Sequence, residues 1–442
     1  MLSHKPGSMT KSRMQSRIKF SWIRNKLRAA KNLAFIHGPL HRFKRFEASF
    51  HPETWARHEE LLAWAEAQAA SAIPEETDND SPEPLVRQGR ELVQSLLRQF
   101  KDRCQRFEQL RILVQVPPPT VSSAHSSLGA NFIQSFRFLG IAAQELGWQS
   151  DTRRTLEEFQ PSVLLTVDHA GYLSQIDWEA IRDYRRHEIL RVGLNAALQE
   201  YGNTRLAGRL EWAKRHEIDF YYTFKSPEYV EKRYGEILER GFSIFYLEFG
   251  ANPLVYYPVP GIRRDLNYVF LGSTNPDKWA RYYSYFGPIL KSCPGYIDGP
   301  WWQSIPRFGG AETHRYLCAR AKVALNLHIP NQINWASELN ERTYNLAACG
   351  VPQLIDNPKL LSSRFSADSF FVARTPEEYQ ASFERILSEP REGERRALQA
   401  QREVFAKYTV FHGAERFVEQ LAPAELFDRV ENSLPASLAA LQ

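Results

Sequence analysis

The 442-residue sequence contains few cysteines and no long uninterrupted hydrophobic run. Its four cysteines, Cys104, Cys293, Cys318 and Cys349, lie far apart and form no CxxC or Cys/His spacing. This usage indicates a reducing compartment and argues against a disulfide framework or a structural zinc site. No stretch reaches the roughly 18 apolar residues of a membrane-spanning helix, and no apolar segment of the signal-peptide kind follows the basic start. We therefore expect a cytoplasmic protein.

Several familiar catalytic motifs are absent as well. The sequence has no GxSxG, no GxxxxGK[ST] and no GxGxxG that opens a predicted helix. These absences argue against a serine hydrolase, a P-loop ATPase or one of the usual nicotinamide dehydrogenases. No Asp-x-Asp motif stands at the end of a predicted strand. The sequence thus demands no metal ion, and we expect no other cofactor.

Acidic residues are missing from positions 1–46, which contain 12 Lys and Arg. The rest of the chain holds 44 basic and 51 acidic residues, so the net charge of +5 comes from this N-terminal arm. Residues 17–36 predict an amphipathic helix with a basic face and an apolar stripe that includes Trp22 and Leu27. Such a helix suits an anionic membrane surface, which would make the protein peripheral on the inner face of the cytoplasmic membrane. A helix docked on the protein's own body is the alternative.

Nucleic acid is a disfavoured partner for this arm, because no further basic surface with interleaved aromatic residues is evident. The arm is followed by a helical stretch over 52–72, an acidic, proline-bearing linker over 72–85 and a second helix over 85–109. We interpret residues 1–109 as a basic helical N-terminal extension.

Strand-like and helical segments alternate from residue 110 onward. A first set has predicted strands at 111–117, 161–169, 188–194, 219–225 and 242–250, with helices at 131–148, 203–216 and 227–240. A segment with two prolines and a glycine, 255–262, separates it from a second set. That set has predicted strands at 266–273, 295–302, 322–330 and 369–374, with helices at 277–292, 311–321 and 376–420. The alternation predicts parallel sheets covered on both faces.

The predicted fold class is α/β, with two doubly wound Rossmann-like domains that face each other across a cleft. We place the first domain at 110–258 and the second at 259–425, followed by a C-terminal tail at 426–442. In sheets of this kind ligands bind outside the carboxyl ends of the strands. We therefore expect the acceptor on the first domain and the donor on the second.

One short segment, "NERTYNLAACGVPQLID" (340–356), carries the main functional signal. It begins a helix directly after the predicted strand 322–330 and ends that helix at Gly350-Val351-Pro352. A helix N-terminus concentrates unpaired N–H groups and partial positive charge, so it favours phosphate. Glu341 and Arg342 stand at that N-terminus as candidate partners of a diphosphate nucleotide. An ordinary helix-to-strand turn is the alternative interpretation.

Residues 322–356 resemble the donor-binding segment of GT-B glycosyltransferases. The nearest group has a glycosyltransferase family 1-like C-terminal domain, as in spore-maturation-type and cell-surface glycan transferases. Its pattern, Asn-x-Arg-x-Phe-Glu-x-x-Ala-Cys-Gly followed by a strand ending in Asp, is matched at Asn340, Arg342, Tyr344, Ala348, Cys349, Gly350 and Asp356. The end of the chain, 408–421, is similar to the closing helix of the same domain. The resemblance covers about 260–425.

The resemblance implies a set of donor-binding residues. The family usually has Glu five positions before the glycine, where it holds the nucleotide ribose, but this chain has Asn345. A neutral amide loses the charge-assisted part of that hydrogen bond, unless Glu338 or Glu341 supplies a carboxylate. The departure also leaves room for a catalytically inactive relative. The full set of candidates is Arg342, Asn345, Glu341, Glu338, Thr343, Gly350, Ser273, Lys278, Arg281 and His328.

Several of these candidates also follow from their positions. Ser273 stands at a strand end, and Lys278 and Arg281 lie in the next helical turns, where cations could stabilise a leaving diphosphate. A solvated helix face is the alternative for Lys278. His328 is a candidate contact for sugar hydroxyls, and a capped loop is the alternative there.

The first domain offers three candidates for the base that deprotonates the acceptor. Asp168 and His169 end an interior strand, and a carboxylate beside an imidazole suits general-base work. A buried, mutually satisfied pair is the competing interpretation. His125, in the loop after the first strand, is the third candidate, and we favour the Asp168–His169 pair.

The sequence therefore predicts a glycosyltransferase that moves a sugar from a nucleotide-diphosphate-sugar to a cell-surface, lipid-linked or protein-linked glycan. The reaction is expected to need no metal, and the resemblance weakly favours retention of configuration. Alternatives are a sugar-nucleotide epimerase or glycan phosphorylase on the same fold, or a nucleotide-sugar-binding protein without catalysis.

Overall fold

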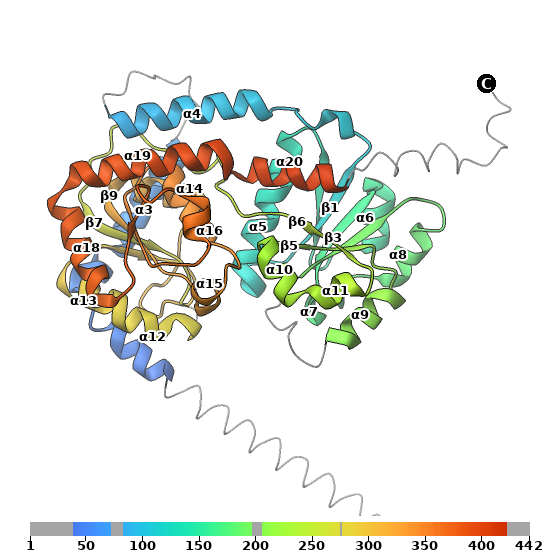
Figure 1. Cartoon of the computed structure of the whole chain (residues 1–442), viewed down its shortest axis with the longest axis horizontal. Helices are drawn as coiled ribbons and strands as arrows, with labels where there is room; N and C mark the ends of the chain where they lie inside the picture. The colour runs from blue at the N-terminus through green and yellow to red at the C-terminus, as the bar shows by residue number, and fades with distance from the viewer. Residues whose placement is uncertain (1–38, 72–82, 197–205, 275, 422–442) are drawn as a thin grey trace, which may run out of the picture.

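The computed structural model describes residues 39–71, 83–196, 206–274 and 276–421. Within them the chain forms two parallel sheets, each flanked by helices on both faces (Figure 1). The predicted fold class, two doubly wound α/β domains with helices before them, is confirmed. The predicted helix at 17–36 and the tail at 426–442 lie outside the described residues.

The first sheet has six strands in the order β2-β1-β3-β4-β5-β6. Its strands are β1 Arg111–Val116, β2 Ala142–Gly147, β3 Val163–Val167, β4 Arg191–Asn195, β5 Phe220–Thr223 and β6 Ser243–Tyr246. Its helices are α5 Pro119–Phe138, α6 Thr152–Phe159, α7 Ala170–Leu173, α8 Trp178–Tyr184, α9 Leu206–Arg215, α10 Pro227–Arg233 and α11 Gly235–Glu239. Central strands such as β3 are buried along their whole length, which explains their continuous apolar sequence.

The second sheet has five strands in the order β11-β10-β9-β7-β8. They are β7 Leu266–Leu271, β8 Tyr296–Asp298, β9 Ala321–Asn326, β10 Gln353–Ile355 and β11 Phe371–Val372. The helices are α12 Trp279–Arg281, α13 Gly287–Ser292, α14 Ala311–Arg320, α15 Pro330–Asn334, α16 Glu341–Ala348, α17 Leu361–Arg364, α18 Pro376–Ser388, α19 Pro390–Lys407 and α20 Val410–Leu421. A π-helical turn, Tyr282–Phe286, joins α12 to α13.

Both sheets reverse their winding direction at one place. In the first sheet the chain leaves β1 toward β2 on one side and β3 on the other, and in the second it leaves β7 toward β8 and β9. Ligands of doubly wound sheets bind outside the carboxyl ends of the strands at such a switch point. The ends of β1 and β3 and the ends of β7 and β9 are therefore the places to examine for a site.

One part of the first domain was predicted wrongly. We expected a Ser/Gly loop followed by a helix over 131–148, but α5 begins at Pro119 and residues 142–147 form β2. The segment before residue 131 is helical because α5 packs against β1 and β2 and because Pro at its start favours helix initiation. The β2 segment pairs with β1 along its whole length. Tertiary pairing therefore overrides the helical propensity of Ala and Glu here.

The N-terminal helices are part of the second domain rather than a detached extension. A helix over 39–47 precedes α2 Pro52–Ala56, α3 His58–Ser71 and α4 Pro84–Phe100. Phe43, Phe46 and Phe50 are buried in the core of the second domain. In addition, α3 packs on α14 and α4 packs on α19 (Figure 1). In the described part of the chain, no helix combines the length and apolarity needed to cross a bilayer.

The last described helix returns to the first domain. We expected residues 259–425 to form one domain, but α20 packs on α5 and β6 (Figure 1). The ring of Phe417 lies 6.2 Å from that of Phe136, and Arg191 donates a hydrogen bond to the Leu421 carbonyl at 2.8 Å. The chain thus crosses between the domains twice, which ties their relative positions together.

Candidate donor and acceptor site

The switch point of the second sheet holds a cluster of cations. Arg342, in the first turn of α16, lies over the Phe270 ring at 4.5 Å and reaches the Asn326 side chain at 3.5 Å. Its guanidinium lies so close to Gly272, at the end of β7, that a Cβ there would be 1.9 Å from Nη2. Only glycine leaves room for this approach. Arg342 therefore lies between the ends of β7 and β9.

Lys278 is the second cation of this cluster. Its side chain is 9% exposed, and no described residue forms a hydrogen bond or ion pair with it. Burial, together with the nearby Arg342, lowers the pKa of Lys278 to about 7. The solvated helix face considered as an alternative is therefore wrong for this residue. A desolvated lysine beside an arginine is unfavourable unless an anion joins them.

The carboxylate of Asp356, at the end of β10, already binds two positively charged or hydrogen-bonding side chains. It accepts from Arg281 at 2.7 Å and from the His328 ring at 2.6 Å. Burial opposes its ionisation, but His328 and Arg281 hold the pKa of Asp356 below its usual value. Of the three cations, Arg281 is thus paired, whereas Arg342 and Lys278 are not matched by a carboxylate among the described residues.

His328 and Thr343 hold neighbouring residues of this site in place. His328 is fully buried, and its Nε2 lies 3.3 Å from the Thr343 hydroxyl while its Nδ1 faces Asp356. Thr343 is also fully buried and accepts from Asn326 at 3.0 Å. These contacts leave neither side chain a free polar atom for a sugar, so the structure does not support our expectation of direct donor contacts. Both instead fix the start of α16, where Asn340 caps the Thr343 N–H.

Glu341 and Asn345, the two residues expected near the donor ribose, lie half-buried one turn apart on α16. Glu341 accepts from Asn131 of α5 at 3.1 Å, so it lies at the boundary between the domains. Burial raises the pKa of Glu341 to about 7, although hydrogen bonds from Asn131 and Asn345 oppose this shift. A carboxylate therefore does lie one helical turn before Asn345, as the sequence suggested. The Oδ1 atom of Asn345 is buried and lacks a partner.

Glu338 forms a second link between the domains. It pairs with Lys225, which follows β5, at 2.7 Å, and both side chains are buried. Among the described residues, neither its buried Oε2 atom nor the buried Arg342 Nε atom has a hydrogen-bond partner. Buried polar atoms are rarely left unpaired. Together with Asn345, these atoms belong to residues in or just before the first turns of α16, where a polar ligand would find hydrogen-bonding partners.

Two further candidates have different roles. Gly350 lies at the opposite end of α16 from the cations, with a φ of +69°, and its carbonyl accepts from Arg264. It ends the helix and does not contact a donor at the switch point, so this assignment is corrected. Ser273 follows β7 beside Gly272, is half-buried, and its carbonyl accepts from Tyr282 at 3.1 Å.

The three candidate bases lie at the switch point of the first sheet, but their contacts differ from those that we expected. Asp168 is buried and forms an ion pair with Arg209 at 2.9 Å. His169 is exposed, caps α7 and accepts from the Gly171 N–H at its Nδ1. Because Nδ1 accepts, Nε2 of the neutral ring carries the hydrogen. Nε2 of His169 therefore has no lone pair for an acceptor proton, which counts against the pair that we favoured.

His125 is better arranged for this task. It lies in α5, its Nδ1 is 3.0 Å from the Ser122 hydroxyl, and its ring is 5.5 Å from that of Tyr172. Burial, and to a lesser degree His169, lower the pKa of His125. The ring is therefore neutral near pH 7. When Nδ1 donates to Ser122, Nε2 carries a free lone pair.

Some polar residues near the site were not among those predicted from the sequence. Asp298, at the end of β8, accepts from His314 at 2.9 Å and lies 3.8 Å from His58 of α3. Burial opposes its ionisation, yet these histidines hold the pKa of Asp298 well below its usual range. Its position at a strand end was visible, but partners 240 and 16 residues away were not. No described group of His, Cys, Asp or Glu has the arrangement of a metal site.

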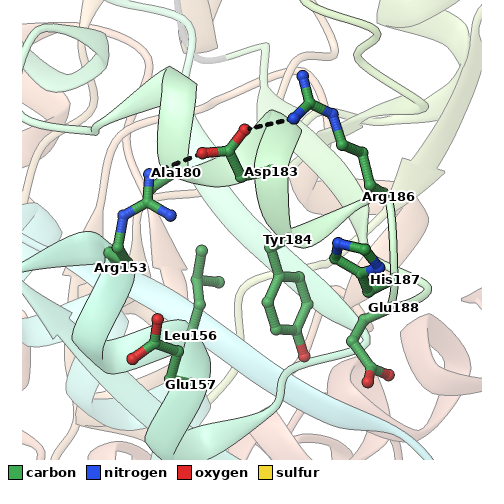
Figure 2. A pocket seen from close by; sticks show the side chains of 9 residues that line it. All are labelled: Arg153, Leu156, Glu157, Ala180, Asp183, Tyr184, Arg186, His187 and Glu188. Atoms are coloured by element: carbon green, nitrogen blue, oxygen red, sulfur yellow. Dashed lines mark hydrogen bonds and ion pairs between the residues drawn. The ribbon is translucent and has the colours of Figure 1, made fainter.

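A hollow of about 330 Å³ on the first domain lies apart from these residues (Figure 2). It is bordered by α6 and α8 and by Arg153, Asp183 and Arg186, which form ion pairs of 2.8 and 3.1 Å. Tyr184 beside it reaches Pro161, just before β3. The hollow is therefore near the amino ends of the strands, and none of the predicted site residues lines it.

Comparison with known proteins agrees with this geometry. Residues 285–419 match the family described as glycosyl transferase-like. The fold is similar to that of sucrose-phosphate synthase from Thermosynechococcus elongatus, with a TM-score of 0.50, 10% identity and coverage of 72% of this chain and 100% of that one. T4 phage BGT in complex with UDP-glucose has a TM-score of 0.46 at 9% identity, covering 70% of this chain and 98% of that one. No curated protein matches the sequence.

The matched domain is glycosyl transferase-like, and the chain as a whole has the two-sheet architecture of the GT-B fold. Its glycosyltransferase-like domain is the C-terminal one, as the resemblance of residues 322–356 implied. The expected class of activity is therefore confirmed as sugar transfer. The assignment to the spore-maturation type stays a prediction.

Proposed function

We propose that the protein transfers a sugar from a nucleotide-diphosphate-sugar to a hydroxyl group of a glycan, with the donor diphosphate at Arg342 and Lys278. The observation that carries this proposal is the pair of cations at the switch point of the second sheet, for which no described residue supplies a carboxylate partner. A diphosphate would supply the missing negative charge. Its ribose would face Glu341 and Asn345, where buried polar atoms lack partners.

The same cations account for the chemistry. Breaking the bond between sugar and diphosphate leaves charge on the departing phosphate, and preorganised cations stabilise that charge. The proposed reaction therefore uses Arg342 and Lys278 where other enzymes use a metal ion. The resemblance of residues 340–356 weakly favours retention of configuration at the transferred sugar.

A screen of UDP-, GDP-, ADP- and dTDP-sugars with the full-length protein tests this function. We expect one donor to raise the melting temperature and to be hydrolysed slowly without an added acceptor. Formation of an isomeric nucleotide-sugar would instead indicate an epimerase, and phosphate-dependent release of a sugar 1-phosphate would indicate a phosphorylase. Binding without any turnover would favour a nucleotide-sugar-binding protein or an inactive relative. No binding of any donor would contradict the proposal.

For the acceptor base we propose His125. Alanine at this position should reduce transfer by about 10²- to 10⁴-fold, the usual contribution of general-base catalysis, without weakening donor binding. Because the base must be neutral and its pKa is lowered, wild-type transfer should decline only below about pH 6.5, its ordinary value. The measurement is a pH–rate profile of transfer with saturating donor.

His169→Ala is the matched control for this prediction, because His169 lies in the same switch point but caps α7. It should retain most of the transfer activity. Full transfer by His125→Ala, with an unchanged pH profile, would rule out His125 as the base.

We further propose that the acceptor is a cell-surface, lipid-linked or protein-linked glycan and that the protein reaches it from an anionic membrane surface. The basic composition of residues 1–46 supports this proposal. So does the helix over 39–47, which buries its phenylalanines in the second domain and exposes Arg42, Lys44 and Arg45. Each cation near an anionic surface contributes about 1 kcal/mol, an attraction that salt screens.

Co-sedimentation with vesicles tests the membrane proposal. Full-length protein should bind vesicles that contain anionic lipid at low salt, dissociate as salt increases and ignore neutral vesicles. Replacement of Arg42, Lys44 and Arg45 by Glu should weaken binding by more than tenfold, since at least two contacts of about 1 kcal/mol are lost. Equal binding to anionic and neutral vesicles would refute an electrostatic attachment.

A further inference from the structure

The loop after β8 displays one aromatic side chain in an unusual way. Trp301 is 65% exposed, the highest value among the large hydrophobic side chains that the structure describes. Its φ of +71° lies in the left-handed region, which bulky residues rarely adopt. The next residue, Trp302, is buried against Phe43 and Phe270. The backbone turn therefore directs one tryptophan inward and its neighbour outward.

This conformation is held from both sides. The Thr274 N–H donates to the Pro300 carbonyl at 3.2 Å, and the Thr274 hydroxyl donates to the Trp301 carbonyl at 2.9 Å. The Gln303 N–H donates to the Glu47 carboxylate at 3.0 Å. A left-handed non-glycine residue persists only where its surroundings fix it, and such residues gather at ligand-binding sites. The Trp301 indole is thus presented on a rigid support.

The loop that holds Trp301 also contacts the cation cluster. The Trp302 indole N–H donates to the Gly272 carbonyl at 2.9 Å, and Gly272 is the residue that the Arg342 guanidinium approaches. Thr274, which holds the Trp301 backbone, lies in the same loop after β7. One loop therefore contacts Arg342 at Gly272 and holds Trp301 through Thr274. The indole is therefore linked through this one loop to the place proposed for the diphosphate.

We propose that Trp301 is the stacking platform for the nucleobase of the donor. This inference rests on the proposed function, since it assumes a nucleoside diphosphate at Arg342 and Lys278. The base is the flat aromatic ring of such a donor, and a flat ring can cover an indole face to face. Stacking on an aromatic side chain accepts every base. Trp301 therefore contributes affinity for the nucleoside and leaves the choice of base to polar contacts.

Isothermal titration of the full-length protein with UDP, GDP, ADP and inorganic pyrophosphate tests this assignment. Trp301→Ala should weaken the preferred nucleoside diphosphate by roughly 5- to 150-fold, the range for loss of one base–aromatic stack. It should leave pyrophosphate affinity unchanged, because pyrophosphate lacks a base. Trp301→Tyr should retain most of the nucleotide affinity. Phe308→Ala, which removes another exposed aromatic side chain of the same loop, is the control and should change neither affinity.

The outcomes separate this inference from the proposed function. Unchanged nucleotide affinity in Trp301→Ala overturns the stacking role alone. Equal weakening of nucleotide and pyrophosphate would show that Trp301 only shapes the loop, and it also overturns the role. Loss of vesicle binding with normal nucleotide affinity would assign the side chain to a lipid surface instead. A wild-type protein that binds neither nucleotide nor pyrophosphate would contradict the proposed function itself.

Discussion

Arg342→Ala is expected to abolish sugar transfer in a protein that remains folded. The guanidinium lies against Gly272 and over Phe270, at the N-terminus of α16, and its Nε atom has no partner. A donor diphosphate at this position would bind this side chain in the ground state. The same side chain would stabilise the negative charge that develops on the phosphate in the transition state. Loss of a group that faces developing charge commonly reduces turnover by 10²- to 10³-fold. We expect a reduction of at least about 100-fold with saturating donor.

The control for this variant is Arg320→Ala in the same domain. Arg320 ends α14 and pairs with Asp265 just before β7, at the amino edge of the sheet. It should behave like wild type in donor turnover. Circular dichroism and melting curves establish that both variants fold. Normal donor affinity and rate in folded Arg342→Ala would remove Arg342 from the site and leave the proposed function without its main support.

The parts of the site that could be predicted are those encoded by adjacent residues. Asn340 as a cap, the start of α16 and the end of that helix at Gly350 all follow from local rules for helix ends. The position of Arg342 after an interior strand followed from the same segment. The alternation of strands and helices predicted two sheets because each element repeats its own period over several residues.

The parts that could not be predicted depend on partners distant in the sequence. Asp168 is next to His169 in the chain but pairs with Arg209, and Thr343 loses its free hydroxyl to Asn326 and His328. Nothing within either segment indicates these partners. The return of α20 to the first domain is of the same kind, since an amphipathic helix does not specify which sheet it covers. Sequence reasoning therefore indicated where a site is expected but misjudged which side chains there are free.

The apposition of the two domains has a consequence for the reaction. Lys225 and Glu338 form a buried ion pair, and Asn131 donates to Glu341, so residues of the first domain contact both ends of the segment that opens α16. Glu341 thus joins the donor side to α5, the helix that also carries His125. Any change in the relative position of the domains would alter the ribose position and the base together. This coupling suits an enzyme that must bring a donor and an acceptor into one arrangement.

Lys278→Met is expected to stabilise the fold while it disables the site. Burial and Arg342 lower the pKa of Lys278 to about 7, whereas an unfolded lysine has a pKa of about 10.4. Each pKa unit of difference corresponds to about 1.4 kcal/mol, so burial of this cation costs on the order of 4 kcal/mol at pH 7. An unbranched apolar side chain of similar length removes this cost. Donor affinity should fall about 10- to 150-fold, as for loss of a hydrogen bond to a charged group.

The dependence on pH distinguishes this explanation from general repacking. Because the folded pKa lies below the unfolded one, the cost is fully present below pH 7 and declines as pH rises toward 10. The stability gained by Lys278→Met in urea titrations should therefore be largest at pH 6–7 and small near pH 10. Lys291→Met, at an exposed lysine of α13, is the control and should change stability little at any pH. A gain independent of pH, or a donor affinity equal to wild type, would show that Lys278 is not the desolvated cation of a diphosphate site.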